Sequence, residues 1–362
     1  MKILVVQDYL RSGGTERQSI LLTRAFASAG HPATLLTFRP GGTLRESAAG
    51  LDLRSLQPFD LHLDWFAPRL VARARALSPD VILCMGRMAN CYGATLQAHL
   101  PDTAVVGSMR TGKNLPLLFR RSLAAVRHIV ANSREARETL VRRYLLPAGN
   151  ITVIHNSLVF PAATATAAGN PSLRAQHGAS PSTTILLNVA MFRPEKNQRE
   201  LIRLVAALPP SADWQLWLAG EGPARAECER LAARLDLQSR IRFLGFLRDP
   251  APLYTAADVA VHASASESLS NFLIEAQAHG LPAVAYAAQG IGECFIPGRT
   301  GWVIPRDDRA AFLAALAPLF QIAPAARAAL AAAARDYARS TFDPARQVAA
   351  YLDLFTRLTH RP

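Results

Sequence analysis

The sequence predicts an α/β protein built from two domains, each containing its own parallel sheet. Strand-like runs alternate with helical stretches along both halves of the chain, which is typical of βαβ units. Small and turn-forming residues interrupt this alternation at 161–171, where we expect a linker. The chain has 362 residues, 50% of them hydrophobic, and this is enough for two cores of ordinary size.

The expected elements follow the same alternating order in both halves. In the first half we expect strands at about 2–7, 33–38, 80–84, 104–108, 127–131 and 151–154, and helices at about 15–29, 67–77, 90–99, 115–124 and 134–145. In the second half we expect strands at about 184–190, 214–219, 241–244, 258–262, 282–286 and 302–304, and helices at about 197–208, 223–236, 252–256, 271–279, 308–321 and 325–340. These patterns place the domains at 1–165 and 166–342. A final segment, 343–362, carries apolar residues at helical spacing: Val348, Tyr351, Leu352, Phe355 and Leu358.

Several protein classes are disfavoured by composition. The four cysteines lack the spacing of a metal or disulfide site, so we expect reduced, buried thiols in a cytoplasmic protein. The first residues form an expected strand rather than a signal peptide. The longest Ala- and Leu-rich stretch, 310–326, falls short of the ~18 consecutive apolar residues of a membrane span. No Asp-x-Asp sequence stands where a divalent cation would be needed, and Asp307 and Asp308 are expected to begin a helix; we therefore expect neither a metal nor a cofactor.

Positive charge is concentrated in the first half of the chain. Residues 1–160 carry 20 Lys and Arg against 10 Asp and Glu, whereas residues 161–362 carry 20 against 17. A basic domain favours an acidic partner. At 117–121, Leu117, Leu118 and Phe119 precede Arg120 and Arg121. This run is either a core-facing stripe with a solvated basic face or a contact with the anionic inner face of the cytoplasmic membrane. Few stacking aromatics accompany it, so we expect no nucleic acid partner.

Two glutamates, Glu267 and Glu275, give the strongest indication of function. Glu267 follows the expected strand at 258–262, and open α/β sheets bind ligands at the carboxyl ends of their strands. Ser270 is a suitable N-cap for a helix that reaches about His279. The free N–H groups of Asn271 and Phe272 would then face an anion such as a diphosphate. We expect the two carboxylates to bracket this position, one on a ribose and the other on a sugar.

Further motifs occur along nearly the whole chain in a fixed order. They are Ser12-Gly-Gly-Thr-Glu16, Val130-Ala-Asn-Ser133, Val153-Ile-His-Asn-Ser157, Arg193-Pro-Glu-Lys-Asn197, Leu218-Ala-Gly-Glu-Gly222, Phe243-Leu-Gly-Phe246 and the glutamate pair. Together they resemble family 4 of the retaining glycosyltransferases. The resemblance implies the GT-B fold, in which two Rossmann-like domains face each other across a cleft and the last helix crosses back to the first domain. It also implies a metal-independent enzyme that moves a sugar from a UDP- or GDP-type donor to a hydroxyl of a glycan or lipid-linked acceptor in surface polysaccharide or glycolipid assembly.

The resemblance assigns roles on the donor side. Lys196 aligns with the family's phosphate-binding lysine, and Glu267 and Glu275 with its glutamate pair. The usual arginine position is Met191 here, and we expect Arg193 to replace it because its longer fork can reach from two residues along. The backbone at Gly245 is implied to contact the nucleobase.

It also assigns roles in the first domain. The loop carrying Gly13, Gly14 and Glu16 is implied to face the donor phosphate and sugar. A histidine that many members carry after the strand at 104–108 is absent, and Arg110 is the residue expected to take its place beside the diphosphate.

Two other functions remain open on sequence alone. A sugar-nucleotide epimerase shares the same two-domain shape, and a non-catalytic protein can bind a nucleotide sugar. The combination of Lys196, Glu267 and Glu275 favours a transferase. The first-helix turn lacks the full G-x-G-x-x-G spacing, which disfavours a dehydrogenase.

Overall fold

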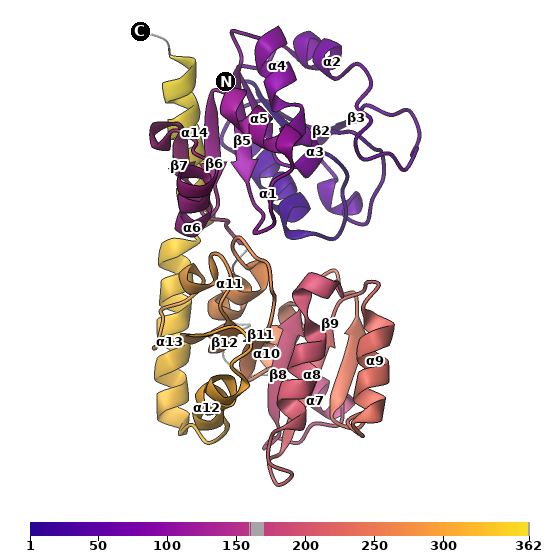
Figure 1. The fold of residues 1–362 in the computed structure, drawn as a ribbon, viewed down its shortest axis with the longest axis vertical. Coiled ribbons are helices and arrows are strands. Elements are labelled where there is room, and N and C mark those ends of the chain that lie inside the picture. The colour runs from indigo at the N-terminus through magenta and orange to yellow at the C-terminus, as the bar shows by residue number, and fades with distance from the viewer. Residues whose placement is uncertain (159, 161–169, 361–362) are drawn as a thin grey trace. The chain divides into compact units, whose positions relative to one another are not determined.

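The chain folds into two compact units. The computed structural model describes residues 1–158, 160 and 170–360. The first unit contains Met1–Ser157 together with the C-terminal segment from Pro344, and the second runs from Leu158 to Asp343 (Figure 1). Most of the expected linker, and with it the predicted domain boundary near residue 165, lies outside the described residues.

The first unit is built on a seven-stranded parallel sheet in the order β3-β2-β1-β4-β5-β6-β7. Its strands are β1 (Ile3–Gln7), β2 (Ala33–Thr37), β3 (Asp52–Ser55), β4 (Val81–Cys84), β5 (Ala104–Met109), β6 (His128–Ala131) and β7 (Ile151–Val153). The six predicted strands are present, whereas the edge strand β3 was not predicted. Its sequence, Asp-Leu-Arg-Ser, exposes two charged side chains and has only one apolar residue, so it lacks a strand signal.

The helices predicted in the first unit are present, but the one at 90–99 is broken and the one at 134–145 changes from α to π geometry at Thr139. They are α1 (Gly14–Ser28), α2 (Leu70–Leu77), α3 (Arg87–Cys91), α4 (Gly93–His99), α5 (Leu117–Ala125), α6 (Arg134–Glu138), the π-helical η2 (Thr139–Arg143) and α14 (Pro344–Thr359), with short 3₁₀ turns η1 (Glu46–Ala48) and η3 (Ala148–Asn150). The single helix predicted at 90–99 divides at Tyr92 into α3 and α4. A side chain from α5 causes this, because Ser122 Oγ accepts a hydrogen bond from Ala94 N (2.8 Å) in the first turn of α4.

Helix α14 packs against α1 and β5 within the first unit. The ring of Phe26 contacts the rings of Tyr351 and Phe355 at centroid distances of 6.0 and 5.7 Å. Gln347 Nε2 donates to Gln18 Oε1 (3.1 Å) and to the carbonyl of His155 (2.8 Å). The apolar spacing seen in the sequence at 348–358 therefore forms a core face of this unit.

The second unit is built on a six-stranded parallel sheet in the order β10-β9-β8-β11-β12-β13. Its strands are β8 (Thr184–Val189), β9 (Trp214–Ala219), β10 (Ile241–Gly245), β11 (Val259–His262), β12 (Ala283–Tyr286) and β13 (Gly301–Ile304). Its helices are α7 (Pro171–Gln176), α8 (Gln198–Ala206), α9 (Arg225–Arg234), α10 (Ala251–Ala256), α11 (Asn271–Ala278), α12 (Arg309–Phe320) and α13 (Pro324–Thr341), with 3₁₀ turns η5 (Pro194–Lys196) and η6 (Ile291–Glu293). Only α7 was not predicted. Asn170 caps α7 through Leu173 N and Pro171 is its first residue, so turn-forming residues here begin a helix.

The order of the strands places a switch point in each sheet. In the second unit the chain proceeds from β8 outward to β9 and β10, and then returns to the other side of β8 with β11. In the first unit the corresponding neighbours are β1 and β4. Ligands of open parallel sheets bind outside the carboxyl ends of the strands at such a point. We therefore expect ligand contacts from the loops after β8 and β11 in the second unit, and after β1 and β4 in the first.

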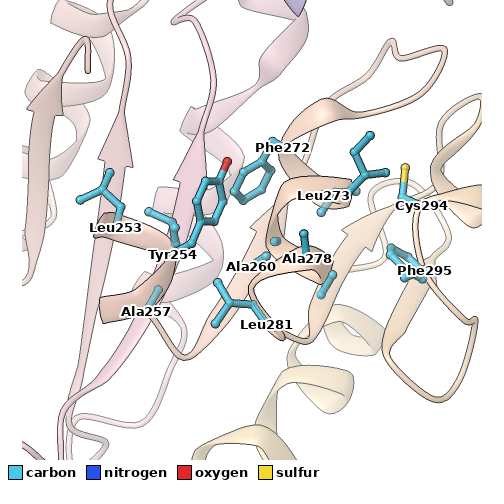
Figure 2. Packing of buried hydrophobic residues seen from close by; sticks show 14 of the residues in the cluster. Leu253, Tyr254, Ala257, Ala260, Phe272, Leu273, Ala278, Leu281, Cys294 and Phe295 are labelled. Atoms are coloured by element: carbon cyan, nitrogen blue, oxygen red, sulfur yellow. The ribbon is translucent and has the colours of Figure 1, made fainter. Parts of the chain in front are cut away.

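Buried hydrophobic side chains form two clusters in each unit. Figure 2 shows part of the core around α10 and α11, where the rings of Tyr254 and Phe272 lie beside each other. Within the described residues no single helix is both long and apolar enough to span a membrane. One pair bent by 115°, Arg309–Phe320 with Pro324–Thr359, meets the criteria of length and composition together.

Candidate functional site

The two loops at the switch point of the second unit are joined by hydrogen bonds. The loop after β8 contains the turn η5, which ends at Lys196. The loop after β11 donates twice to the carbonyl of Glu195, from Ser264 Oγ (3.0 Å) and from Ala265 N (2.8 Å). The side chains carried by the two loops are therefore held near each other.

Lys196 and Glu267 form an ion pair at this junction. Lys196 Nζ lies 2.5 Å from Glu267 Oε1. His262, the last residue of β11, is 1% exposed, and its Nε2 lies 2.9 Å from the same oxygen. Glu267 itself is 8% exposed. The sequence predicted Lys196 and Glu267 as site residues but missed His262. A single histidine at the end of a strand carries no signal that distinguishes it from a structural histidine.

The surroundings of Glu267 keep it ionised. Burial by itself raises the pKa of this carboxyl group, but the charge of Lys196 and the hydrogen bond from His262 outweigh burial and lower the pKa to about 2. Both of these partners contact the same oxygen, Oε1. The negative charge of Glu267 is therefore a fixed feature of the site.

Helix α11 begins beside this pair as predicted. Ser270 is its N-cap, and its hydroxyl accepts a hydrogen bond from Leu273 N (3.4 Å). The ring of Phe272 is buried against Tyr254 and His262, at centroid distances of 6.1 and 5.8 Å, so its expected contribution is limited to its backbone N–H. In this first turn Ser270 accepts from Leu273 N through its hydroxyl and from Ile274 N (3.1 Å) through its carbonyl, so the predicted anion contact concerns the N–H groups of Asn271 and Phe272 and stays a prediction.

Glu275 lies within α11 and has a different partner from Glu267. The hydroxyl of Tyr254, from α10, donates to Glu275 Oε2 at 2.5 Å. The ring of Tyr254 is stacked on His279 at 4.8 Å. Tyr254, which sequence reasoning did not identify, therefore orients the carboxylate of Glu275.

Glycines allow the backbone of neighbouring loops to approach this site. Gly220 has φ +140°, and a Cβ there would lie 2.0 Å from the carbonyl oxygen of Ala190. Gly220 N donates to the carbonyl of Gly245 (2.7 Å), which has φ +72° at the end of β10. The predicted nucleobase position, Gly245, is thus connected through β9 to the loop that carries Lys196.

Arg193 begins the turn that ends at Lys196. Its carbonyl accepts a hydrogen bond from Lys196 N (2.9 Å), and its own N–H donates to the carbonyl of Met191 (2.9 Å). In the part of the chain that the structure describes, no hydrogen bond or ion pair holds its guanidinium group. Arg193 therefore lies on the same turn as Lys196, and its role at a diphosphate stays a prediction.

The predicted residues of the first unit have partners within that unit. Gly13 is the N-cap of α1, and a Cβ there would lie 2.3 Å from Glu16 Oε2, so the carboxylate of Glu16 folds back over the start of the helix next to Gly14. Arg110 Nη1 donates to Asn156 Oδ1 (2.5 Å) and Arg110 Nη2 to Tyr351 Oη (2.9 Å). These bonds attach the guanidinium of Arg110 to α14, and its role beside a diphosphate stays a prediction.

A buried carboxylate at the end of β1 was not predicted. Asp8 accepts hydrogen bonds from Met88 N (2.9 Å) and Ala89 N (2.7 Å) at the start of α3. Burial raises the pKa of Asp8 to about 6, although these two hydrogen bonds partly oppose the shift. Asp8 therefore fixes the loop after β4 at the switch point of the first unit. Among the described residues, no group of three or more His, Cys, Asp or Glu side chains is arranged to hold a metal ion.

The pKa of Glu267 predicts how acid affects the stability of the second unit. Because the folded-state pKa is lowered from 4.5 to about 2, the stabilisation is complete above about pH 4.5 and is lost as the pH falls toward 2. Over this whole range it amounts to on the order of 3 kcal/mol. We expect Glu267→Gln to be less stable near neutral pH and to lose less stability on acidification, as measured by thermal unfolding at a series of pH values.

Glu227 provides the matched control for this measurement. It forms an exposed ion pair with Arg199 (2.6 Å), and exposed pairs contribute little. Glu227→Gln should therefore show the acid dependence of the wild type. An unchanged acid dependence in Glu267→Gln would contradict the charge assignment.

Comparison with known proteins identifies the family to which both units belong. Residues 12–158 match the family model described as Glycosyltransferase Family 4, and residues 170–337 match Glycosyl transferases group 1. A lipopolysaccharide core biosynthesis glycosyltransferase of Rhizobium meliloti, LpsE, is 26% identical over 314 residues, which cover 84% of this chain and 85% of LpsE. A D-inositol 3-phosphate glycosyltransferase of Streptomyces avermitilis is 29% identical over 270 residues, covering 69% of this chain and 53% of the relative.

Solved structures agree on the fold. The crystal structure of Anabaena HepE in complex with UDP-glucose superposes with a TM-score of 0.83 at 21% identity, covering 99% of this chain and 100% of HepE. WaaG, a glycosyltransferase involved in lipopolysaccharide biosynthesis, superposes with a TM-score of 0.75 at 18% identity, covering 98% of this chain and 100% of WaaG. These likenesses confirm the predicted two-domain α/β architecture as that of GT-B proteins. With family models matched in both units, the chain belongs to the group 1 glycosyl transferases of family 4 and is a glycosyltransferase.

Proposed function

We propose that the enzyme is a retaining, metal-independent glycosyltransferase that uses a nucleotide diphosphate sugar. The observation that carries the proposal is the Lys196–Glu267 pair at the switch point, beside the start of α11. UDP-glucose bound to HepE supports a UDP-type donor. The name of LpsE supports a hydroxyl acceptor in lipopolysaccharide or related glycan assembly.

The residues of the second unit suit the departure of a nucleoside diphosphate. Negative charge builds up on the leaving phosphates, and a preorganised cation stabilises it without reorganisation. Lys196, Arg193 and the N–H groups of α11 supply positive charge in one place, which is the role a divalent metal plays in other transferases. In a retaining reaction of this kind the leaving phosphate accepts the proton of the acceptor hydroxyl, so no separate base is required.

The two glutamates bind different parts of the donor in this proposal. Glu267 binds hydroxyls of the transferred sugar through the oxygen that Lys196 and His262 leave available, Oε2. Glu275, oriented by Tyr254, binds the ribose. Gly13, Gly14 and Glu16 keep the donor contact that the family resemblance implies. Membership of a transferase family favours this activity over an epimerase or a non-catalytic binder.

Loss of the Lys196 charge should slow the chemical step. We expect Lys196→Ala to lower turnover on the order of 10²–10³-fold, because one preorganised stabilising group is removed. A thermal-shift series with UDP, GDP and their sugars first identifies the donor, since only a ligand that binds the folded state raises the unfolding temperature. Release of free sugar from that donor then measures turnover. Lys2→Ala, a change at an exposed lysine, is the control, and near-normal turnover in Lys196→Ala would overturn the proposal.

Loss of Glu275 should weaken nucleotide binding. We expect Glu275→Ala to reduce the affinity for the free nucleotide by about 1–3 kcal/mol, because the ribose hydroxyls lose their acceptor. Calorimetric titration with UDP measures this. Tyr254→Phe removes the partner but keeps the carboxylate, so its effect should be smaller. Equal affinities in the wild type and Glu275→Ala would exclude the ribose assignment.

We further propose a peripheral contact between the first unit and the inner face of the cytoplasmic membrane. Leu117 and Leu118 are 57% and 60% exposed in α5, whereas Phe119 is buried. Arg120 and Arg121 are exposed on the same helix. The core-facing interpretation therefore applies to Phe119 but not to the two leucines, which leaves them available to an apolar interface beside anionic headgroups.

A second exposed apolar group of this unit was not predicted. It lies in the segment between β3 and α2 and consists of Phe59, Leu63, Trp65 and Phe66. Asp60 and Asp64 in the same segment are paired with Arg39. Moving these two carboxylates into the membrane interface would cost part of their solvation free energy. Helix α5 is therefore the better membrane contact.

Binding to vesicles tests the membrane contact. We expect co-sedimentation with phosphatidylglycerol vesicles that weakens with salt and falls when Arg120 and Arg121 are changed to Glu, because each cation near the surface contributes ~1 kcal/mol. Phe59→Ser with Trp65→Ser is the comparison variant and should bind as the wild type does. Equal binding to neutral phosphatidylcholine vesicles, or loss only in the comparison variant, would exclude α5 as the contact.

A further inference from the structure

The hydrogen-bond partners of His262 determine which ring nitrogen carries the proton. Asn188 Nδ2 donates to the carbonyl of Val261 (2.9 Å), and this bond fixes the orientation of the amide. The same nitrogen lies 3.5 Å from His262 Nδ1, so its second hydrogen faces that atom. Nδ1 is therefore the acceptor and Nε2 carries the proton. Nε2–H donates to Glu267 Oε1, since an ionised carboxylate can only accept.

Lys196 has two competing partners once a diphosphate is present. In the ligand-free structure its charge is neutralised by Glu267 Oε1. A phosphate group at the start of α11 attracts the same ammonium group, and a lysine side chain has the rotational freedom to turn toward it. Glu267 would then be a buried carboxylate deprived of its cation, which is strongly unfavourable unless another donor stays in place.

We infer that His262 is a positioning residue that holds Glu267 ionised and in place while Lys196 turns to the diphosphate of the donor. His262 is suited to this because it belongs to β11 and not to a loop, and because its ring is packed against Phe272. Among the described residues, Lys196 is the charged side chain that contacts the His262–Glu267 pair from another loop. The inference rests on the proposed nucleotide site and adds to it the way in which Lys196 is released.

The inference predicts that UDP binding is linked to proton uptake in a variant that lacks the N–H group of His262. In His262→Leu, Glu267 loses both partners when UDP binds, and burial then favours its protonated form. Between about pH 6 and 8, UDP binding by His262→Leu should take up more protons than UDP binding by the wild type, up to about one per site, and the affinity should be about ten- to a hundredfold lower. Calorimetric titration with UDP in buffers of different ionisation enthalpy measures both quantities. Protons taken up by UDP itself cancel in the difference.

Three further variants separate positioning from a general effect on folding. His262→Gln keeps an N–H donor near the place of Nε2 and should restore most of the affinity without the proton uptake. His128→Leu removes a comparably buried histidine of the first unit, whose Nε2 lies 2.9 Å from Thr152 Oγ1, and should bind UDP like the wild type. Glu267→Gln combined with His262→Leu should show no extra proton uptake, because the group that titrates is absent.

The outcomes distinguish this inference from the proposed function. If the wild type binds neither UDP nor GDP, the nucleotide site is rejected and the inference with it. If the wild type binds UDP and His262→Leu, shown to be folded by its thermal transition, binds it equally and without extra proton uptake, only the inference is overturned. Nitrogen NMR spectra of histidine-labelled protein give an independent check without ligand, since a proton on Nδ1 of His262 would also overturn it.

Discussion

The second unit depends on one electrostatic constraint, which is that a buried carboxylate at the end of β11 must keep its partners. An unpartnered charge in this position would cost several kcal/mol, a large part of the stability of a domain. Lys196 reaches Glu267 from the loop after β8, and His262 reaches it from β11. The two strands are neighbours only because the strand order reverses between them. The topology therefore places the charge, and the charge in turn fixes the two loops.

Much of the fold is predictable because most strands are buried on both faces. Parallel strands of this kind are continuous apolar runs, as at 81–84 and 283–286, and they are recognisable without knowledge of their neighbours. β3 lacks this signal because it is an edge strand with exposed charges. The break at Tyr92 has no signal in its own helix, since Ser122 of another helix provides the hydrogen bond that replaces the helical one. Local patterns predict elements, whereas contacts between distant segments modify them.

The same distinction applies to the site. Lys196, Glu267 and Ser270 carry their signal in the spacing of local motifs, and the structure places the first two in contact. His262 and Tyr254 carry no such signal, because their importance arises from which carboxylate each one meets. Arg110 shows the opposite case. Its position after β5 predicts a ligand contact, which stays a prediction, whereas its hydrogen bond to Tyr351 of α14, 241 residues further along the chain, could not be predicted from the local sequence.

The loop that carries Met191 at the position of the usual arginine is held through its backbone. The carbonyl of Met191 accepts hydrogen bonds from Arg193 N and from Gln198 Nε2 (3.1 Å), so the backbone here is held firmly while the side chain is only partly buried. Arg193 follows on the same turn as Lys196. The two cations differ in their state before a ligand arrives, because Lys196 is neutralised by Glu267 whereas the charge of Arg193 is not compensated within the described residues. An uncompensated cation attracts an anion from a distance of about one Debye length, roughly 8–10 Å. In the proposed mechanism Lys196 acts only at contact, after it leaves Glu267. We therefore expect this loop to divide the work between its two cations, with Arg193 attracting the donor and Lys196 stabilising the leaving group.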